Sequence, residues 1–244
     1  MGINDILYKL NEINFEDTIK IYIPSLQRVA PFKPLSLQQQ KEILKAGISS
    51  EIFNVLEFNA TFNSIIDQNS LEKNVYRLTD RPVIAIAMRN KFTSQPLDLD
   101  GTQIDTKIFE NKVINFDSDT FNDFVIEEGS LKLLIQSPSL NLDQTITKLQ
   151  LSKIKNTNKL DLTNIIGEMY VFEILKYIKG LCVSDLEQDL NQLSIEDRLR
   201  LVEQLPASII TKLNRLISEK FKTPEDEYLT CGDNKLSLDA RLFV

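Results

Sequence analysis

The spacing of the apolar residues changes along the chain, and this change constrains the fold more than any other feature. Ile19, Ile21 and Ile23 alternate with other residues, and a period of two places them on one face of a half-buried strand. Beyond Leu140 the apolar residues recur at spacings of three and four, which is typical of helices that bury one face. The chain is therefore expected to be an α+β protein, with a small antiparallel sheet and helices in its N-terminal part and helices in its C-terminal part.

Local signals place the elements of the N-terminal part. Ser36 and Gln39 have the spacing of a capping box, so a helix is expected over 37–46, closed by Gly47. The strand near residue 20 is expected to share a sheet with a strand near residue 130. The other expected elements are an edge strand within 28–34, a helix over 50–67, a helix over 83–89 with Thr79 as its cap and a buried strand as the alternative, short strands over 104–109 and 113–116, and a hairpin of 124–127 with 131–135.

Helical spacing continues through most of the C-terminal part. A long helix is expected over 161–179, with Gly180 as its C-cap. The other expected elements are a helix over 142–155, one or two helical turns within 184–190, a helix that opens at Ser194 and ends at Leu205-Pro206, a helix over 207–221 and a small hairpin around 232–234. The predicted parts are 1–140 (mixed α+β), 141–226 (helical) and 227–244 (hairpin-like tail).

The chain contains no histidine, the residue that most often transfers protons near neutral pH and most often binds metals. This excludes Ser-His-Asp, Cys-His and HExxH chemistry. The net charge is −7 and the basic residues are scattered, which disfavours nucleic-acid binding. No run approaches the roughly twenty apolar residues of a membrane span, and the first residues carry acids rather than a basic leader. A protein made in the cytoplasm, without a membrane span, is therefore predicted.

One acidic stretch, Asp98-Leu99-Asp100-Gly101, superficially resembles a calcium loop. An EF-hand loop requires a bidentate Glu six residues beyond the glycine, where this chain has Lys107. A solvated loop is the favoured interpretation, and no metal is predicted. A histidine-free enzyme that uses a metal ion near Asp98, Asp100 and Asp105 stays as an alternative.

Two adjacent acidic pairs, Glu127-Glu128 and Glu196-Asp197, are candidates for paired carboxylates in acid–base chemistry. Adjacent side chains on a strand or a helix point apart, so turn polarity and charge at a helix start are the favoured roles. The chain has no GxxxxGK[ST] or GxGxxG loop to hold phosphates. No catalytic residue and no cofactor are therefore predicted.

The two cysteines offer at most one disulfide. Cys182 and Cys231 are expected to be free thiols in a reducing compartment. Cys231-Gly232 has the form of half a zinc knuckle, but no second cysteine stands two or three residues upstream. A structural zinc is not predicted.

An ordered series of short motifs extends over nearly the whole chain. The series comprises Phe32-Lys33-Pro34-Leu35-Ser36 before a helix, Leu78-Thr79-Asp80 before an apolar helix ending at Arg89, a strand from Leu131 into Ser137-Pro138-Ser139-Leu140, a helix ending Tyr177-Ile178-Lys179, Leu193 to Arg198 continuing through Val202 to Pro206, and a terminal Cys-Gly turn. Taken in this order, the chain resembles the baseplate hub family of T-even-type contractile-tailed phages, which includes a hub subunit and a related hub-assembly protein. Members often have a tyrosine where this chain has Ser137, and a pair of C-terminal cysteine knuckles where it has Cys231 alone.

The resemblance implies a structural or assembly role in the central hub of the tail baseplate, by protein–protein contact and without catalysis. The implied partners are other hub and spike proteins and the tape-measure or tail-tube proteins. The implied location is the host cytoplasm, and the virion baseplate if the protein is retained in the particle. Besides the metal-dependent enzyme, a host-directed regulatory protein that binds one cellular partner is a further alternative.

Overall fold

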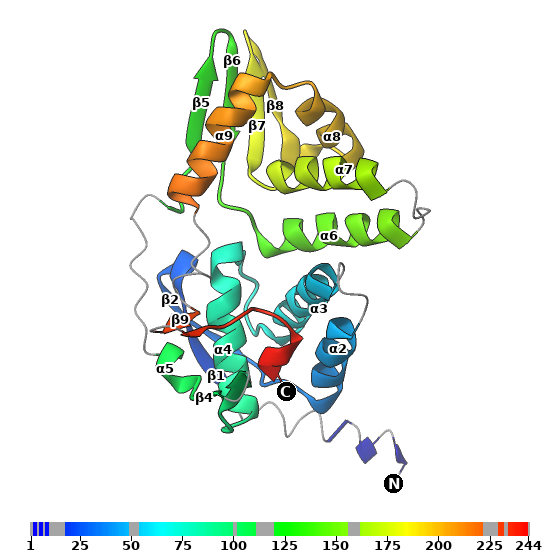
Figure 1. Ribbon diagram of the computed structural model, residues 1–244, viewed down its shortest axis with the longest axis vertical. Coiled ribbons are helices and arrows are strands. Elements are labelled where there is room, and N and C mark those ends of the chain that lie inside the picture. The colour runs from blue at the N-terminus through cyan, green and yellow to red at the C-terminus, as the bar shows by residue number, and fades with distance from the viewer. Residues whose placement is uncertain are drawn as a thin grey trace. The chain divides into compact units, whose positions relative to one another are not determined.

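The computed structural model describes residues 2–3, 5–6, 8–9, 18–48, 54–99, 102–110, 120–155, 162–221, 229–231 and 234–243. The chain divides into two compact units, and the first combines both ends of the chain, Met1–Ile114 with Pro224–Val244. The second unit is Asn115–Thr223. The predicted boundary after residue 140 falls inside the second unit, and the whole of the predicted tail, 227–244, belongs to the first (Figure 1).

The first unit contains helices and three two-stranded antiparallel sheets among its described residues. Its elements are β1 (Ile19–Ile23), β2 (Arg28–Phe32), α2 (Leu37–Gly47), α3 (Asn54–Asn69), α4 (Arg81–Phe92), β3 (Leu97–Leu99), β4 (Thr102–Ile104), α5 (Lys107–Glu110), β9 (Thr230–Cys231), β10 (Asn234–Lys235) and short 3₁₀ helices at Pro24–Leu26, Leu78–Asp80 and Ala240–Phe243. With the second unit described below, the α+β class is confirmed.

The first hairpin and the helix after it form as the sequence predicts. In β1, Ile21 and Ile23 are buried, and Ile21 lies opposite the buried Ala30 of β2. Ser36 accepts a hydrogen bond from the amide of Gln39 at 3.2 Å, and the Gln39 side chain accepts one from the amide of Ser36 at 3.0 Å. The predicted capping box is confirmed, and α2 follows it.

Several local predictions for this unit are corrected. Helix α4 is confirmed as a buried helix, but Asp80 rather than Thr79 stands at its N-cap, because a 3₁₀ turn precedes it. The strand predicted over 104–109 is wrong, because β4 ends at Ile104 and α5 begins at Lys107. The whole of the strand predicted over 113–116 lies outside the described residues. The turn residues 232 and 233 also lie outside them, although β9 and β10 pair on either side.

The C-terminal segment completes the core of the first unit. Phe243 is fully buried, with its ring centroid 5.4 Å from that of Phe62 and 6.3 Å from that of Phe58. The backbone carbonyl of Phe243 accepts a hydrogen bond from the Gln40 side chain at 2.9 Å. The C-terminal segment therefore shares one aromatic cluster with α3 and a hydrogen bond with α2.

The buried Arg89 of α4 forms a hydrogen bond with the same C-terminal segment. Arg89 is 1% exposed, and its guanidinium donates to the carbonyl of Leu242 at 2.8 Å, to the hydroxyl of Thr106 at 2.7 Å and to the carbonyl of Gln95 at 2.8 Å. Burial lowers the pKa of Arg89, while nearby Asp105 opposes this shift. The planar guanidinium group, with its several N–H donors, thus connects α4 to Gln95, Thr106 and Leu242.

A methyl group added at Gly47 is expected to destabilise the first unit. A Cβ at this position would lie 2.2 Å from the Cβ of Ala240, so α2 and the C-terminal segment would have to separate. We expect Gly47→Ala to lower the free energy of unfolding by about 1–3 kcal/mol in urea titrations. Gly167→Ala is the control, because a Cβ there meets nothing within 4 Å in α7 (Leu162–Leu175) and is expected to stabilise the helix by about 0.5–1 kcal/mol. Equal effects of the two substitutions would contradict this packing.

The second unit combines a four-stranded antiparallel sheet, in the order β5-β6-β7-β8, with helices. Its elements are β5 (Phe124–Glu128), β6 (Leu131–Ile135), α6 (Leu140–Lys155), α7 (Leu162–Leu175), β7 (Ile178–Val183), β8 (Leu186–Asp189), a 3₁₀ helix at Leu190–Gln192, α8 (Ile195–Glu203) and α9 (Ala207–Lys220). The predicted hairpin near residue 130 is confirmed, with Gly129 at a φ of 60° in its turn. Its sheet does not include β1, so the single shared sheet is a wrong prediction.

The helix predicted over 161–179 ends at Leu175, so its last turn is wrongly predicted. The helical turns predicted within 184–190 are also wrong, because β7 and β8 form a hairpin there. Gly180 is a strand residue rather than a C-cap, and a Cβ there would lie 3.1 Å from the carbonyl oxygen of Gln188 in the neighbouring strand. Ser184 adopts a φ of 56° in the turn. The close approach of the two strands explains why a glycine stands at this point.

One face of the sheet carries the hydrophobic core of the second unit. The core unites the sheet with its helices, through Ile126, Leu133, Ile135, Ile146, Phe172, Leu175, Ile178, Val202, Ile209 and Leu213, among others. Helix α9 lies along β5 (Figure 1). A buried ion pair joins Lys176 to Asp143 at 2.7 Å, and the same ammonium group contacts the half-exposed Glu173 at 2.7 Å.

Candidate functional site

A surface on the first unit is formed by the β1–β2 hairpin and by residues 70–77. The second segment runs beside β2, where the amide of Leu71 donates to the carbonyl of Pro31 at 3.1 Å. Phe32 and Ser70 form an antiparallel bridge. Backbone contacts alone therefore connect the two segments.

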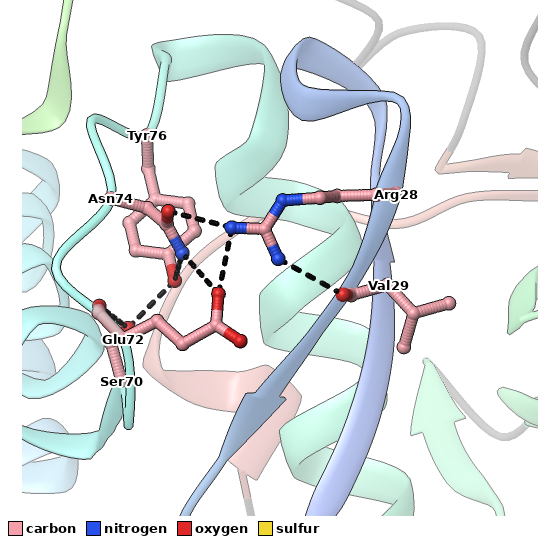
Figure 2. A network of polar contacts seen from close by, with 6 residues as sticks. All are labelled: Arg28, Val29, Ser70, Glu72, Asn74 and Tyr76. Atoms are coloured by element: carbon pink, nitrogen blue, oxygen red, sulfur yellow. Dashed lines mark hydrogen bonds and ion pairs between the residues drawn. The ribbon is translucent and has the colours of Figure 1, made fainter.

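A chain of polar side chains reinforces this contact, as Figure 2 shows. The guanidinium of Arg28 lies 2.7 Å from a carboxylate oxygen of Glu72 and donates to the side-chain oxygen of Asn74 at 2.9 Å. The Asn74 amide donates to the same Glu72 oxygen at 3.1 Å and to the hydroxyl of Tyr76 at 3.2 Å. The hydroxyls of Tyr76 and Ser70 are 2.6 Å apart. Five side chains are thus held in one network.

The electrostatics of this network suit recognition better than acid–base chemistry. The hydrogen bond from Arg28 lowers the pKa of Glu72, and the hydrogen bond to Glu72 raises the pKa of Arg28. A carboxylate with a lowered pKa is a weak base, so Glu72 is a poor candidate for proton abstraction. The ring centroids of Tyr76 and the buried Phe32 are 5.4 Å apart. This ring contact connects the network to the core.

Exposed apolar side chains occupy the same two segments. Tyr22 and Val29 lie directly opposite each other on the outer face of the hairpin, and they are 55% and 50% exposed. Val75, between two members of the network in sequence, is 59% exposed. Tyrosine and arginine are enriched among the residues that dominate protein–protein interfaces. We call Tyr22, Arg28, Val29 and Val75 the hairpin surface.

The buried carboxylate of Asp80 holds the loop after β1 against the start of α4. It accepts hydrogen bonds from the amide and hydroxyl of Ser25 at 3.0 and 2.5 Å, and from the amide of Arg77 at 2.7 Å. Burial raises the pKa of Asp80 above its ordinary value, and these hydrogen bonds oppose the shift. The same carboxylate therefore supports the end of the hairpin.

The raised pKa of Asp80 predicts a specific pH dependence of stability. The folded protein binds this proton more tightly than the unfolded chain, so the contribution of Asp80 is largest below its unfolded pKa and falls as pH rises through the folded pKa. Asp80→Asn does not titrate. We therefore expect the wild type to lose stability relative to Asp80→Asn as pH is raised from about 4, measured by urea unfolding at each pH. A relative gain of the wild type with rising pH would contradict the raised pKa.

The structure describes two of the three aspartates considered for a metal. Asp98 lies in β3 and accepts a hydrogen bond from the Gln103 side chain at 3.0 Å, while Asp105 accepts one from the amide of Lys107 at 3.0 Å. Asp100 lies outside the described residues. Across the part of the chain that the structure describes, no three acidic or cysteine side chains are grouped to hold a metal ion.

The adjacent acidic residues of β5 face different partners. Glu127 pairs with Lys132 at 2.7 Å, and Glu128 pairs with Lys212 of α9 at 2.8 Å. The hydrogen bond from Lys212 lowers the pKa of Glu128. The two carboxylates therefore do not form a joint site.

The remaining candidates occupy local structural positions. Asp197 donates its amide to the hydroxyl of Ser194, the N-cap of α8, at 3.1 Å, and Glu196 beside it is exposed. Cys182 is a free thiol that donates to the carbonyl of Ser184 at 3.2 Å. Cys231 lies in β9. None of these contacts brings the candidates together.

Sequence reasoning did not identify the network of Figure 2. Arg28 and Glu72 are 44 positions apart, and no local pattern predicts their pairing. The one available signal was the alternation in β1, which places Tyr22 on the face opposite the buried isoleucines.

Comparisons with known proteins add no further assignment to these features. No helix in the described ranges is long and apolar enough to cross a membrane. No family model, no curated protein and no solved structure matches the chain.

Proposed function

We propose that this chain is a structural or assembly protein of the central baseplate hub of a contractile-tailed bacteriophage, and that it acts by protein–protein contact rather than by catalysis. The ordered motifs from Phe32 to the terminal Cys-Gly turn support the hub, through the resemblance described above. The partners proposed are other hub and spike proteins and the tape-measure or tail-tube proteins. The protein is made in the host cytoplasm and lies in the tail baseplate if it is retained.

The observation that carries the contact role is the hairpin surface. Two half-exposed apolar side chains, Tyr22 and Val29, lie opposite each other on the hairpin, and Arg28, next to Val29 in sequence, has its orientation already fixed by Glu72 and Asn74. A side chain that is held in place before binding loses less conformational entropy on association. The surface therefore has the composition and the preorganisation of a protein-binding site.

Deletion of the gene from its phage tests the proposal. Electron microscopy of the resulting lysates is expected to show no complete baseplates, because the hub organises the tail. Mass spectrometry of purified wild-type particles then separates a retained subunit from an assembly factor that leaves. Intact tails after the deletion would contradict the hub role in either form.

A further inference from the structure

The outer face of the β1–β2 hairpin is apolar at its centre. In the hairpin register, Tyr22 lies opposite Val29 and Lys20 lies opposite Pro31. Alternation along each strand places these four side chains on the face away from the buried core. Figure 2 shows the Val29 side chain directed away from the polar network as well. The next segment adds Leu71, which is 38% exposed and whose amide donates to the Pro31 carbonyl.

The segments that build this face are positively charged, although the chain as a whole is acidic. Residues 18–35 and 70–77 contain five cations and one carboxylate, a net charge of +4, whereas the whole chain carries −7. The carboxylate, Glu72, is already paired with Arg28. The nearby Asp80 carboxylate is fully buried. The local charge is therefore opposite in sign to that of the whole chain.

Two of the five cations are free to meet a partner. Lys20 and Lys73 are exposed, and neither makes a hydrogen bond or an ion pair in the part of the chain that the structure describes. Lys20 stands on the outer face itself, and Lys73 lies in the adjoining segment. The three other cations already have interaction partners: Arg28, Lys33 and Arg77. Two unpaired ammonium groups thus accompany the apolar centre.

This combination favours one class of partner over two others. A nucleic acid fits weakly, because two free cations neutralise only two phosphates and its electrostatic affinity grows with the number neutralised. Valine, proline and leucine also offer no aromatic ring on which bases stack, which leaves Tyr22 alone. A second copy of the chain, packed face to face, would bring the same two ammonium groups and repel them. An acidic protein segment with apolar side chains complements both the charge and the apolar centre.

We propose that the outer face of the hairpin binds an acidic segment of a partner protein, in which carboxylates face Lys20 and Lys73 and aliphatic side chains pack on Tyr22 and Val29. This inference rests on the proposed function, because it names the chemistry of the partner that meets the hairpin surface. Opposite charge on the two partners also speeds their association.

Nuclear magnetic resonance titration of the full-length ¹⁵N-labelled protein tests the inference. The probe is a hexapeptide of alternating leucine and glutamate. We expect saturable shift changes concentrated in residues 20–31 and 71–75, and a dissociation constant raised about tenfold by Lys20→Glu combined with Lys73→Glu. Lys41→Glu combined with Lys148→Glu is the control, because it makes the same charge change at two exposed positions outside this face. It is expected to leave the dissociation constant unchanged.

Two further peptides separate the charge from the apolar contact. A hexapeptide of alternating glycine and glutamate and one of alternating leucine and lysine are each expected to bind at least about tenfold more weakly than the probe. Equal binding of the first would indicate a simple anion site, and equal binding of the second an unselective apolar surface. Either result would overturn the inference, as would tighter binding of single-stranded hexathymidylate than of the probe.

The remaining outcomes distinguish this inference from the hub role. No saturable binding of the probe, shift changes centred elsewhere, or equal weakening by the control pair would each overturn the acidic partner. If one of these occurs while gene deletion still abolishes baseplates, only the partner chemistry is wrong. If the probe binds as expected but deletion leaves tails intact, the hub role is wrong and the binding face stands.

Discussion

Phe243→Ala is expected to lower the free energy of unfolding of the first unit by about 3–5 kcal/mol. The side chain is fully buried against Phe58 and Phe62, and its removal leaves a cavity in a cluster that unites both ends of the chain. Urea unfolding of the full chain measures the loss. Hydrogen exchange followed by segment is expected to show faster exchange in α2, α3 and α4, with little change in β5 to β8.

A surface substitution provides the matched control for this prediction. Ile48, beyond the end of α2, is 83% exposed, so Ile48→Ala is expected to change stability by no more than about 0.5 kcal/mol. A Phe243→Ala variant as stable as Ile48→Ala would show that the C-terminal segment does not contribute to the core. Equal acceleration of exchange in both units would contradict their separate cores.

Lys176→Met is expected to destabilise the second unit by about 3–5 kcal/mol. The substitution removes the cation that faces Asp143, and the two side chains are only 5% and 3% exposed. A buried carboxylate without its cation loses the attraction that offsets its desolvation. Urea unfolding measures the effect, and exchange in α6 and α7 is expected to increase while α2 to α4 stay unchanged.

A double variant separates the charge effect from the packing effect. Asp143→Asn combined with Lys176→Met removes both charges at once, so it is expected to be more stable than Lys176→Met alone. Glu173→Gln is the exposed comparison, because its carboxylate contacts the same lysine but is 53% exposed, and it is expected to cost no more than about 1 kcal/mol. A double variant less stable than the single one would contradict a buried charge pair as the cause.

The sequence predicted those elements whose signals are local. The capping box of Ser36 and Gln39, the alternation of Ile21 and Ile23, and the turn at Gly129 each depend on residues within a few positions of one another. Each of the three features is present in the structure. The α+β class follows from the same local patterns.

The errors arose where distant contacts decide the structure. The apolar spacing of α7 continues into Ile178, so the start of β7 was not visible, and Gly180 was interpreted as a helix end although the nearby carbonyl of Gln188 explains it. The network of Arg28 and Glu72 depends on a contact across 44 positions. Even the burial of Arg89 depends on the carbonyl of Leu242, which lies 153 positions away in sequence.

Complementation of the gene deletion by variants of the hairpin surface tests the contact role most directly. Tyr22→Glu with Val29→Glu places two charges on a half-exposed apolar pair without entering the core. Ile48→Glu, just beyond the end of α2, is the control for an added charge at an exposed apolar position. All proteins are first shown to unfold at comparable urea concentrations. The account predicts that the wild type and Ile48→Glu restore infectious particles with complete baseplates and that the double variant does not; full restoration by the double variant would contradict it.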